Sequence, residues 1–368
     1  MKTLTKETRV HRLPMSGPND TAALAEKITE GFIVPAGIVA ILGKTEGNGC
    51  VNDFTRGYAV QSLKTSLSQY LSQQALSNIC FIMSGGTEGA LTPHWIVIET
   101  VNIEATPSAE KALAVGHSIT RDFLPNEIGT NVQLDIVAEG VRAAMAEADI
   151  NDTNDVHFVQ IKCPLITSER VRKAGGASEV ATTDTLKSMG LSRGASALGV
   201  ASALGEISDH FLSNAKIGTD TDLFSSRASC SAGVELMGCE IVVLGMSEMW
   251  SGPLAIEHTV MMDAIDMSSV LRLTDRALGH SQGQLREDQS QRVKAVLTKA
   301  EAAKSGFVRG QRHTMLNDSD VSSTRHARGF VGGLLGGIFG DTALFVSGGA
   351  EHQGPDGGGP CALIYEKE

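Results

Sequence analysis

The chain has 368 residues, of which 42% are hydrophobic and 4% aromatic, and its 40 glycines favour tight turns and close backbone approaches. Its net charge of −11 argues against nucleic-acid binding, because such binding needs a basic patch. The six cysteines form no C-x-x-C pair, and no signal peptide or apolar run long enough to span a bilayer is found, so we expect a cytoplasmic protein with reduced thiols and no membrane contact.

Each third of the chain predicts the same order of elements: a helix, a strand leading to Lys, a capped helix that starts with Arg, and a strand near Ser. The first third predicts a helix over 20–28, a strand over 38–42 before Lys44, a helix from Thr55 to Leu71 and a strand over 80–83 before Ser84. The second third predicts a helix through Val137, Val141 and Met145, a strand over 156–161 before Lys162, a helix capped by Ser192, and Ser231 followed by a strand over 241–244. The last third predicts a helix over 263–278, a strand over 293–297 leading to Lys299, a helix capped by Thr324 and a strand over 343–346 before Ser347.

A pentapeptide with the pattern Ser-(Gly/Ala)-Gly-x-Glu occurs once in each third, at 84–88, 231–235 and 347–351. The small residue after each serine lets a ligand approach the backbone N–H, and the hydroxyl beside it can attack a carbonyl or hold an oxyanion. One copy would be consistent with a plain turn, but three copies indicate an internal repeat. Changes in composition near 104–111 and 251–256 predict the joints between the units, which we place at 1–104, 112–250 and 256–368.

The three lysines that follow apolar strands are candidate bases. A single Lys at a strand end is usually solvated, but the recurrence of Lys44, Lys162 and Lys299 suggests a shared role. Burial and nearby arginines would lower the pKa of such a lysine, and its neutral amine could then deprotonate a serine. The segment Gly43-Lys44-Thr45 resembles part of a P-loop, but this interpretation is weakened because position 38 is Ile where that motif requires Gly.

The arginines that open the expected helices are candidate ligand-binding residues. Arg56, Arg193 and Arg325 each follow a Ser or Thr, and helix N-termini favour anions. Three guanidinium groups around one centre would suit a small ligand with three carbonyl or anionic oxygens. The histidines show no recurring Ser-His-Asp order, so a Ser-His hydrolase is a weaker alternative. The Gly-rich stretch 350–359 is consistent with a flexible turn or with a carbonyl-rich site for a hard cation.

Several long motifs resemble the family of cyanuric acid amidohydrolases and barbiturases. The likeness covers nearly the whole chain, and its clearest segments are 43–56, 83–89, 157–164, 313–316 and 346–355. The resemblance implies an α+β fold of three pseudo-symmetric repeat units that form a barrel around a central active site, with helices outside. It also implies a homo-oligomer, specifically a homotetramer.

The resemblance further implies that a Ser-Lys dyad in the middle unit, Ser231 and Lys162, opens the ring of cyanuric acid to carboxybiuret, which yields biuret and carbon dioxide. Ser229 is a neighbouring alternative for the nucleophile. The other two lysines would support the site. The residues implied to bind substrate are Arg56, Ser84, Gly85, Arg193, Ser231, Ala232, Arg325, Ser347 and Gly348.

The resemblance also implies a structural Mg²⁺ or Ca²⁺ and no organic cofactor. The metal ligands would be Glu301, Ala350, Gln353, Gly354, Pro355 and Gly358. Val321, four residues before Arg325, is either a core valine or a pocket-wall residue that sets substrate choice. Three alternatives to a cyanuric acid hydrolase stay open: a barbiturase, a module that binds a small ligand without catalysis, and a phosphate binder of the P-loop type, which Ile38 makes the weakest of the three.

Overall fold

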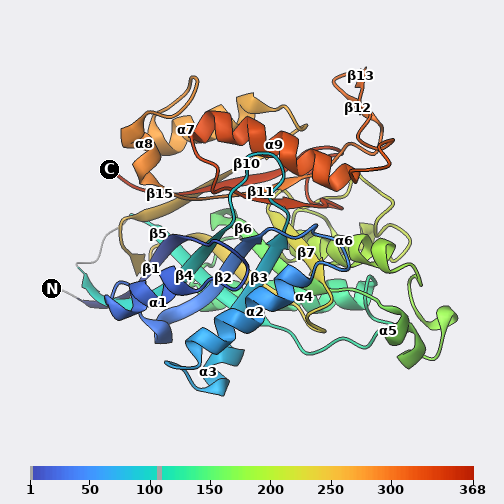
Figure 1. Ribbon diagram of the computed structural model, residues 1–368, viewed down its shortest axis with the longest axis horizontal. Helices are drawn as coiled ribbons and strands as arrows, with labels where there is room; N and C mark the ends of the chain where they lie inside the picture. Colours follow the sequence, from blue (N-terminus) through green and yellow to red (C-terminus); the bar gives the residue numbers. More distant parts are fainter. Residues whose placement is uncertain (1–2, 106–109) are drawn as a thin grey trace.

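The computed structural model describes residues 3–105 and 110–368, and within them each third of the chain contains four main strands with helices between them (Figure 1). The first third has β1 (Thr3–Pro14), α1 (Ala22–Thr29), η1 (Pro35–Gly37), β2 (Ile38–Thr45), α2 (Phe54–Leu67), α3 (Gln73–Ser77), β3 (Cys80–Gly85) and β4 (His94–Ala105). The second has β5 (Ala112–Ile119), α4 (Asn131–Glu147), η2 (Thr153–Asp155), β6 (Val156–Pro164), α5 (Ser168–Lys173), η3 (Ala177–Glu179), α6 (Thr185–Ala203), η4 (Asp209–Phe211), β7 (Ala228–Gly233), β8 (Glu240–Ser247) and β9 (Trp250–Ser251). The last has β10 (Leu254–Met261), α7 (Met267–Leu278), α8 (Glu287–Arg292), β11 (Val293–Ala300), β12 (Phe307–Val308), β13 (Gln311–Arg312), α9 (Ser323–Phe339), β14 (Phe345–Gly348) and β15 (Gly359–Glu366).

The three main sheets share one strand order. They run β1-β4-β2-β3, β5-β8-β6-β7 and β10-β15-β11-β14, and β9 adds to the first sheet beside β1. In every sheet the lysine-bearing strand lies between the last strand, to which it is antiparallel, and the serine-bearing strand, to which it is parallel. The fold is therefore α+β with mixed sheets, as predicted. Within the described part of the chain, hydrogen bonds do not join these strands into one closed barrel.

Alternation along the strands separates a central core from outer cores. On β2, Ala40 and Leu42 pack in a cluster that also contains residues of the other two sheets, whereas Ile41 packs with the helices of its own unit. On β11, Leu297 faces the shared cluster, and its neighbour Val296 faces the cluster that contains α7 and α9. The inner faces of the three sheets consequently pack against one another.

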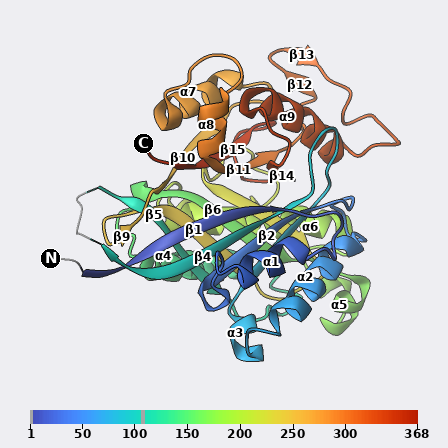
Figure 2. The ribbon, with the colours of Figure 1, turned by 60° about the vertical axis from the view of Figure 1, so that its left-hand side comes forward.

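The helices lie on the outside of the packed sheets. Figures 1 and 2 show α7, α8 and α9 over the outer face of the last sheet, with α1, α2 and α3 on the opposite side of the molecule. Across residues 3–105 and 110–368, no helix is both long and apolar enough to cross a membrane. All six cysteines are free in this structure, and Cys80 is among the five that are buried.

Three helix starts differ from the sequence prediction. Asp53, not Thr55, caps α2, because its carboxylate accepts a hydrogen bond from the Thr55 N–H. The helix expected to start at Ser192 begins at Thr185, so Ser192 is buried in mid-helix. The N-cap position of α9 is Ser322 rather than Thr324. Arg193 therefore lies inside a helix, away from the helix N-terminus at which we expected it.

The sequence prediction also missed strands at the margins of the repeats. β1, β5 and β10 precede the first helix of each third, and β4 and β15 follow the serine strands of the first and last thirds. The expected joint at 104–111 includes residues 106–109, which lie outside the described residues. The other joint, expected at 251–256, contains the end of β9 and the start of β10 at Leu254.

Candidate active site

Three Lys–Ser pairs lie at the inner ends of the three sheets. Lys44 is in register with Ser84, Lys162 with Ser231, and Lys299 with Ser347, each across a parallel strand pair. Each of these residues except Ser231 lies an even number of positions along its strand from residues that face the shared core, as Lys44 does from Ala40 and Leu42. Their side chains therefore point toward that core. The Oγ atoms of Ser231 and Ser347 lie 3.0 Å apart, which brings the second and third units into direct contact at this point.

The three lysines are buried to an unusual degree. Their exposed fractions are 0% for Lys44, 0% for Lys162 and 1% for Lys299. Burial lowers the pKa of Lys44 well below its usual value and lowers the pKa of Lys299 to about 7, and in each case an arginine charge acts in the same direction. Burial and the Arg56 charge also lower the pKa of Lys162, although Glu235 opposes them. The three lysines are therefore buried, and burial acts on their pKa in the predicted direction.

Two of the lysines reach across to the neighbouring unit. Lys162 Nζ donates to the main-chain oxygen of Met83 at 2.8 Å, and Lys299 Nζ donates to that of Cys230 at 2.9 Å. Met83 and Cys230 are the residues immediately before Ser84 and Ser231. These bonds fix the edges of the three sheets relative to one another, so the serine positions depend on packing between units.

The hydroxyl contacts differ among the three pairs. Lys299 Nζ donates to Ser347 Oγ at 3.1 Å, and the corresponding distance between Lys44 and Ser84 is 3.5 Å. In the described part of the chain, Lys162 Nζ contacts Met83 and Glu235 instead of Ser231 Oγ. Hydrogen bonding alone would therefore favour the third pair as the reactive one.

Three largely buried arginine–glutamate contacts join the units in a ring. Arg56 of the first unit lies 3.9 Å from Glu235 of the second, and Arg193 of the second unit forms a two-point ion pair with Glu351 of the third at 2.7 and 2.8 Å. The ring is completed by Arg328 of the third unit and Glu88 of the first, whose contacts are 2.7 and 2.8 Å. The three acids are the glutamates of the repeated pentapeptide.

Arg328, and not only Arg325, corresponds to the arginines of the other units. The Arg328 side chain is 3% exposed and holds Glu88 with its Nε and Nη2 atoms, whereas Arg325 is 40% exposed and contacts Glu88 through Nε alone at 2.9 Å. The sequence analysis missed Arg328. A partial signal was the dipeptide Arg-Gly, which occurs at 56–57, 193–194 and 328–329, although it also occurs at 309–310.

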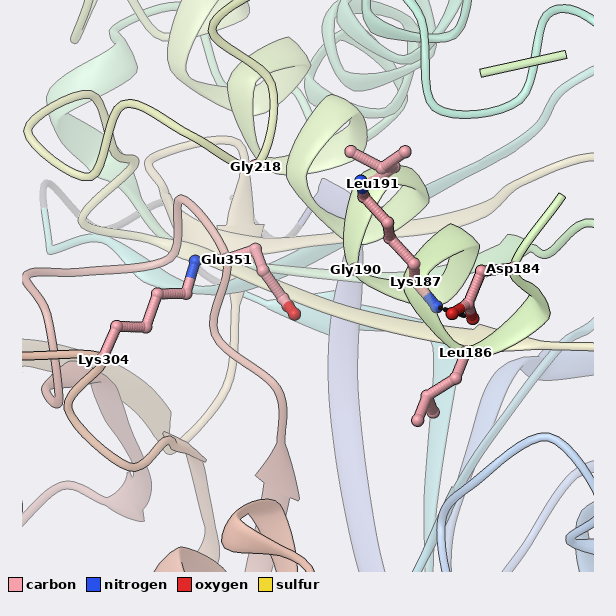
Figure 3. Close-up of a pocket in the computed structure, with 8 residues that line it drawn as sticks. All are labelled: Asp184, Leu186, Lys187, Gly190, Leu191, Gly218, Lys304 and Glu351. Atoms are coloured by element: carbon pink, nitrogen blue, oxygen red, sulfur yellow. Dashed lines mark hydrogen bonds between the residues drawn. The ribbon is translucent and has the colours of Figure 1, made fainter. Parts of the chain in front are cut away.

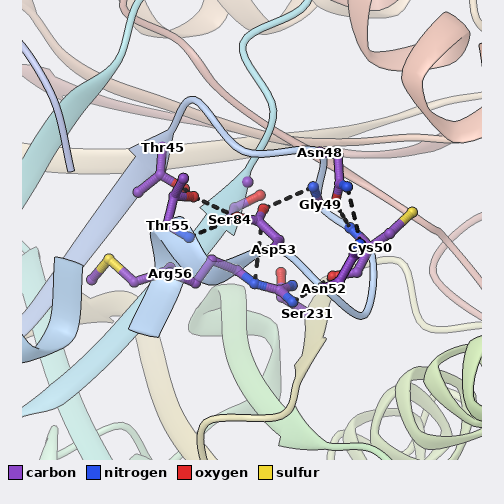
Figure 4. Close-up of polar contacts among 12 residues, drawn as sticks. Thr45, Asn48, Gly49, Cys50, Asn52, Asp53, Thr55, Arg56, Ser84 and Ser231 are labelled. Carbon is purple, nitrogen blue, oxygen red and sulfur yellow. Dashed lines mark hydrogen bonds and ion pairs between the residues drawn. The ribbon is translucent and has the colours of Figure 1, made fainter. Parts of the chain in front are cut away.

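Figure 4 shows how the loop before α2 positions Arg56. Arg56 donates to the main-chain oxygens of Ala232 at 3.0 Å and Cys50 at 2.7 Å, so its guanidinium lies beside the residue that follows Ser231. The Asp53 carboxylate, which accepts from Gly49 N–H at 2.8 Å, occupies the space where a side chain at Gly85 would lie. Gly85 is therefore required for this packing, whatever its contact with a ligand.

Ser229 lies on the same strand as Ser231 but opposite Gln160, not opposite a lysine. Cys230, between the two serines, is buried, and its N–H donates to the Gln353 side chain at 2.6 Å. The loop expected to hold a metal therefore contacts the strand of Ser231 as well as that of Ser347.

Four of the six expected metal ligands, Glu301, Ala350, Gly354 and Pro355, line a small cavity of ≈ 20 Å³ that Lys304 also lines, whereas Gln353 and Gly358 are not among its lining residues. Such a volume holds about one water-sized particle. Burial and the neighbouring Glu351 carboxylate raise the pKa of Glu301, so a cation would relieve the repulsion at this point. No three acidic, His or Cys side chains cluster as a metal site within residues 3–105 and 110–368. The expected set, with one carboxylate and main-chain carbonyls, nevertheless fits a hard cation.

A larger cavity of ≈ 330 Å³ lies near the start of α6, away from the three serines. Figure 3 shows Glu351 and Lys304 on one side of it and Lys187 and Gly190 of α6 on the other. Glu351 thus faces this cavity while its carboxylate pairs with Arg193.

Comparison with known proteins shows the family of this chain. A family model described as amidohydrolase ring-opening protein matches residues 9–366. The chain belongs to this ring-opening amidohydrolase family. It is 57% identical to a cyanuric acid amidohydrolase of Bradyrhizobium sp. (strain ORS 375) over 100% of both chains, and 55% identical to one of Azorhizobium caulinodans over 97% of both.

Solved structures of the family superpose on the whole chain. The crystal structure of the cyanuric acid hydrolase from A. caulinodans has a TM-score of 0.90 at 54% identity and covers 99% of this chain and 100% of its own. A second solved structure is that of a cyanuric acid hydrolase, described as an evolutionary innovation by structural concatenation. It has a TM-score of 0.94 at 46% identity, and the match covers 98% of this chain and 100% of its own. The resemblance inferred from the motifs is therefore confirmed.

Proposed function

We propose that this ring-opening amidohydrolase hydrolyses cyanuric acid with Ser231 as nucleophile and Lys162 as base. The observation that carries the proposal is the convergence of three buried Lys–Ser pairs in a chain 57% identical to a cyanuric acid amidohydrolase. A planar ring with three carbonyl oxygens matches three such pairs arranged about one centre. The repeated strand order supports a three-fold pseudo-symmetric arrangement of the units, with the site on its axis.

In the proposed mechanism, the neutral Lys162 amine takes the Ser231 proton while Oγ attacks one ring carbonyl carbon. Hydroxyl and N–H groups of the Ser-Gly and Ser-Ala pairs at 84–85, 231–232 and 347–348 stabilise the resulting oxyanion and hold the other two carbonyls. The C–N bond breaks as the ring nitrogen receives the proton from Lys162. Water then releases carboxybiuret, which loses carbon dioxide to give biuret.

The middle pair is preferred over the others for two reasons. Its motif position matches the family pattern, and only here does the motif glutamate contact the lysine itself, at 2.8 Å between Lys162 Nζ and Glu235 Oε1, among the described ion pairs. The competing pair, Lys299 and Ser347, has the shorter hydroxyl contact. Substitution of each serine separates the two assignments, as argued in the Discussion.

Arg56, Arg193 and Arg325 remain the proposed clamps for the substrate oxygens. Arg325 is the most accessible of the three, and it lies near the start of α9. The supporting lysines, Lys44 and Lys299, would polarise the carbonyls held by Ser84 and Ser347.

The experiment that tests the proposal is a side-by-side rate measurement on cyanuric acid and barbituric acid with the purified protein. A clear preference for cyanuric acid is expected, because groups that accept a hydrogen bond from the third ring N–H are left unpaired by the methylene of barbituric acid. Faster opening of barbituric acid would make the chain a barbiturase. Calorimetric binding of either ring without turnover would make it a binding module.

Val321 is a candidate for part of this preference. It is partly exposed and precedes α9, with its N–H bonded to Asp318 at 3.0 Å, so it is not a core residue. Changing Val321 to Leu or Thr should alter the ratio of kcat/KM for the two rings by roughly the 1–3 kcal/mol typical of apolar pocket contacts. The melting temperature should change little. An unchanged ratio with a large loss of stability would remove Val321 from the pocket.

A metal ion in the small cavity would be held by Glu301 and the carbonyls of Ala350, Gln353, Gly354, Pro355 and Gly358. When bound, Mg²⁺ or Ca²⁺ would neutralise the carboxylate charge and order the loop that follows Ser347. The loop itself already positions Gln353, whose side chain accepts from Cys230 N–H. No step of the proposed reaction requires the ion.

Chelation should therefore lower the melting temperature more than it lowers the initial rate, because a ligand that binds only the folded state stabilises it by mass action. The comparison is a thermal melt and an initial-rate assay with and without EDTA, followed by re-addition of Mg²⁺ or Ca²⁺. Immediate and complete loss of activity in protein that is still folded would contradict a structural role and indicate metal-activated water.

The homotetramer and the cytoplasmic location stay predictions. Free cysteines throughout the described structure support a reducing compartment. Light scattering coupled to size exclusion would measure the assembly.

A further inference from the structure

The glutamate of the repeated pentapeptide has a different partner in the middle unit. Glu88 holds Arg328 and Arg325, and Glu351 holds Arg193. Glu235 instead lies 2.8 Å from Lys162 Nζ, with Arg56 farther away at 3.9 Å. Three copies of one motif thus give arginine–glutamate ion pairs in the first and last units and a contact with the proposed base in the middle one.

A glycine in the motif reflects the same difference. A Cβ at Gly86 or Gly349 would collide with the guanidinium of Arg328 or Arg193. A Cβ at Gly233 would instead lie 2.0 Å from Glu235 Oε2. In the middle unit the space above the glycine is therefore filled by the glutamate, whose carboxylate turns back toward Lys162.

The surroundings of this contact are well defined. Lys162 is faced by Arg56 from α2, by Glu235 and by Cys163 of its own strand, and Glu240 is close enough for its charge to interact with Lys162. Glu235 also interacts with the charge of Arg170 and lines a cavity together with Lys64.

We infer, on the basis of the proposed function, that Glu235 is a positioning residue that completes a Ser231–Lys162–Glu235 triad. It holds the Lys162 amine and stabilises the ammonium that forms when Lys162 accepts the Ser231 proton. No proton passes to Glu235, which stays a carboxylate while the same proton goes on from Lys162 to the leaving ring nitrogen. This is the role that a carboxylate plays for the base in Ser-His-Asp hydrolases.

The triad predicts a pH effect with a definite sign. Burial lowers the pKa of Lys162, and the Glu235 carboxylate opposes that shift. Removing the negative charge therefore lowers the pKa of Lys162 further, and the neutral base becomes available at lower pH. The acidic limb of the kcat/KM profile should move to lower pH in Glu235→Gln, while the plateau rate falls because the ammonium loses its partner.

The experiment compares pH profiles of Glu235→Gln, Glu235→Asp and Glu88→Gln with wild type, using cyanuric acid as substrate. Glu235→Gln should lower the plateau kcat by about 10²-fold, which is the low end of the contribution of a positioned base. It should also lower the pH at the midpoint of the acidic limb of the kcat/KM profile. Glu235→Asp, which keeps the charge, should restore the wild-type midpoint. Glu88→Gln, the matched change in the first unit, should weaken kcat/KM through its arginines and leave the midpoint unmoved.

Chemical rescue separates positioning from folding. Glu235 lines a cavity of ≈ 470 Å³ together with residues of α2 and α3, and this cavity would admit a small carboxylate. Formate should restore part of the activity of Glu235→Ala, whereas chloride at equal ionic strength should not.

The outcomes distinguish this inference from the proposed function. If Ser231→Ala and Lys162→Ala are inactive but Glu235→Gln keeps the wild-type plateau and midpoint, the triad is wrong and the dyad stands. A Glu235→Gln variant that loses activity with an unmoved midpoint, while Glu235→Ala is not rescued by formate, would reduce Glu235 to a structural residue. Turnover by Lys162→Ala would overturn both proposals.

Discussion

Replacing Ser231 or Lys162 with Ala is expected to reduce turnover of cyanuric acid by at least about 10⁴-fold, because each change removes the nucleophile or its base. The double variant should be no slower than either single variant, since residues that act as one catalytic unit are not additive. Single-turnover kinetics with cyanuric acid, combined with a thermal melt of each variant, measures this.

The third pair provides the matched control for that result. Ser347→Ala removes a hydroxyl that accepts from Lys299 at 3.1 Å and lies 3.0 Å from Ser231 Oγ, so weaker substrate binding is expected with residual turnover. Ser84→Ala should behave in the same way. If Ser347→Ala is the inactive variant and Ser231→Ala still turns over, the dyad belongs to the third unit, as its shorter hydrogen bond would suggest.

The second large effect is expected at Arg328 and concerns stability. Arg328→Ala should lower the free energy of unfolding by about 3–5 kcal/mol, because it leaves a carboxylate that is only 12% exposed without its main partner. Arg325→Ala removes a guanidinium whose side chain is 40% exposed, so its effect on stability should be no more than about 1 kcal/mol. The kcat/KM of the Arg325→Ala variant should instead fall about 10- to 150-fold if Arg325 binds a substrate oxygen.

The pH dependence of the Arg328 effect has a definite direction. Burial alone would raise the pKa of Glu88, but hydrogen bonds and charge from Arg328, with Arg325, lower it to about 2. A depressed carboxylate pKa contributes stability above the unfolded value near 4.5, and that stability is lost as the pH falls toward 2. Denaturant melts should therefore show the difference between wild type and Arg328→Ala shrinking below about pH 4.5. Equal destabilisation by Arg325→Ala and Arg328→Ala would contradict the distinction between them.

Local sequence patterns determined much of this protein. Continuous apolar runs such as 38–42 predicted buried strands, and the repeated Ser-(Gly/Ala)-Gly-x-Glu pentapeptide predicted three equivalent units. The lysines could be placed because each follows directly on an apolar run, and the structure puts Lys44 and Ser84 in register as the pattern required. Helix starts were less accurate, since Ser192 has the residue type of a cap but lies in the middle of α6.

Only the tertiary structure decided which charges meet. Arg328 and Glu88 are far apart in sequence, and the Arg-Gly dipeptide that distinguishes the buried Arg328 from the more exposed Arg325 also occurs at Arg309, whose side chain is 55% exposed. The three glutamates have identical motif positions, yet Glu235 alone turns to a lysine among the described contacts, because packing between the first and second units places Arg56 against the main chain of Ala232. Sequence patterns specify the secondary structure of a segment and the side chains it carries, whereas the partner of a buried charge depends on how separate sheets pack together.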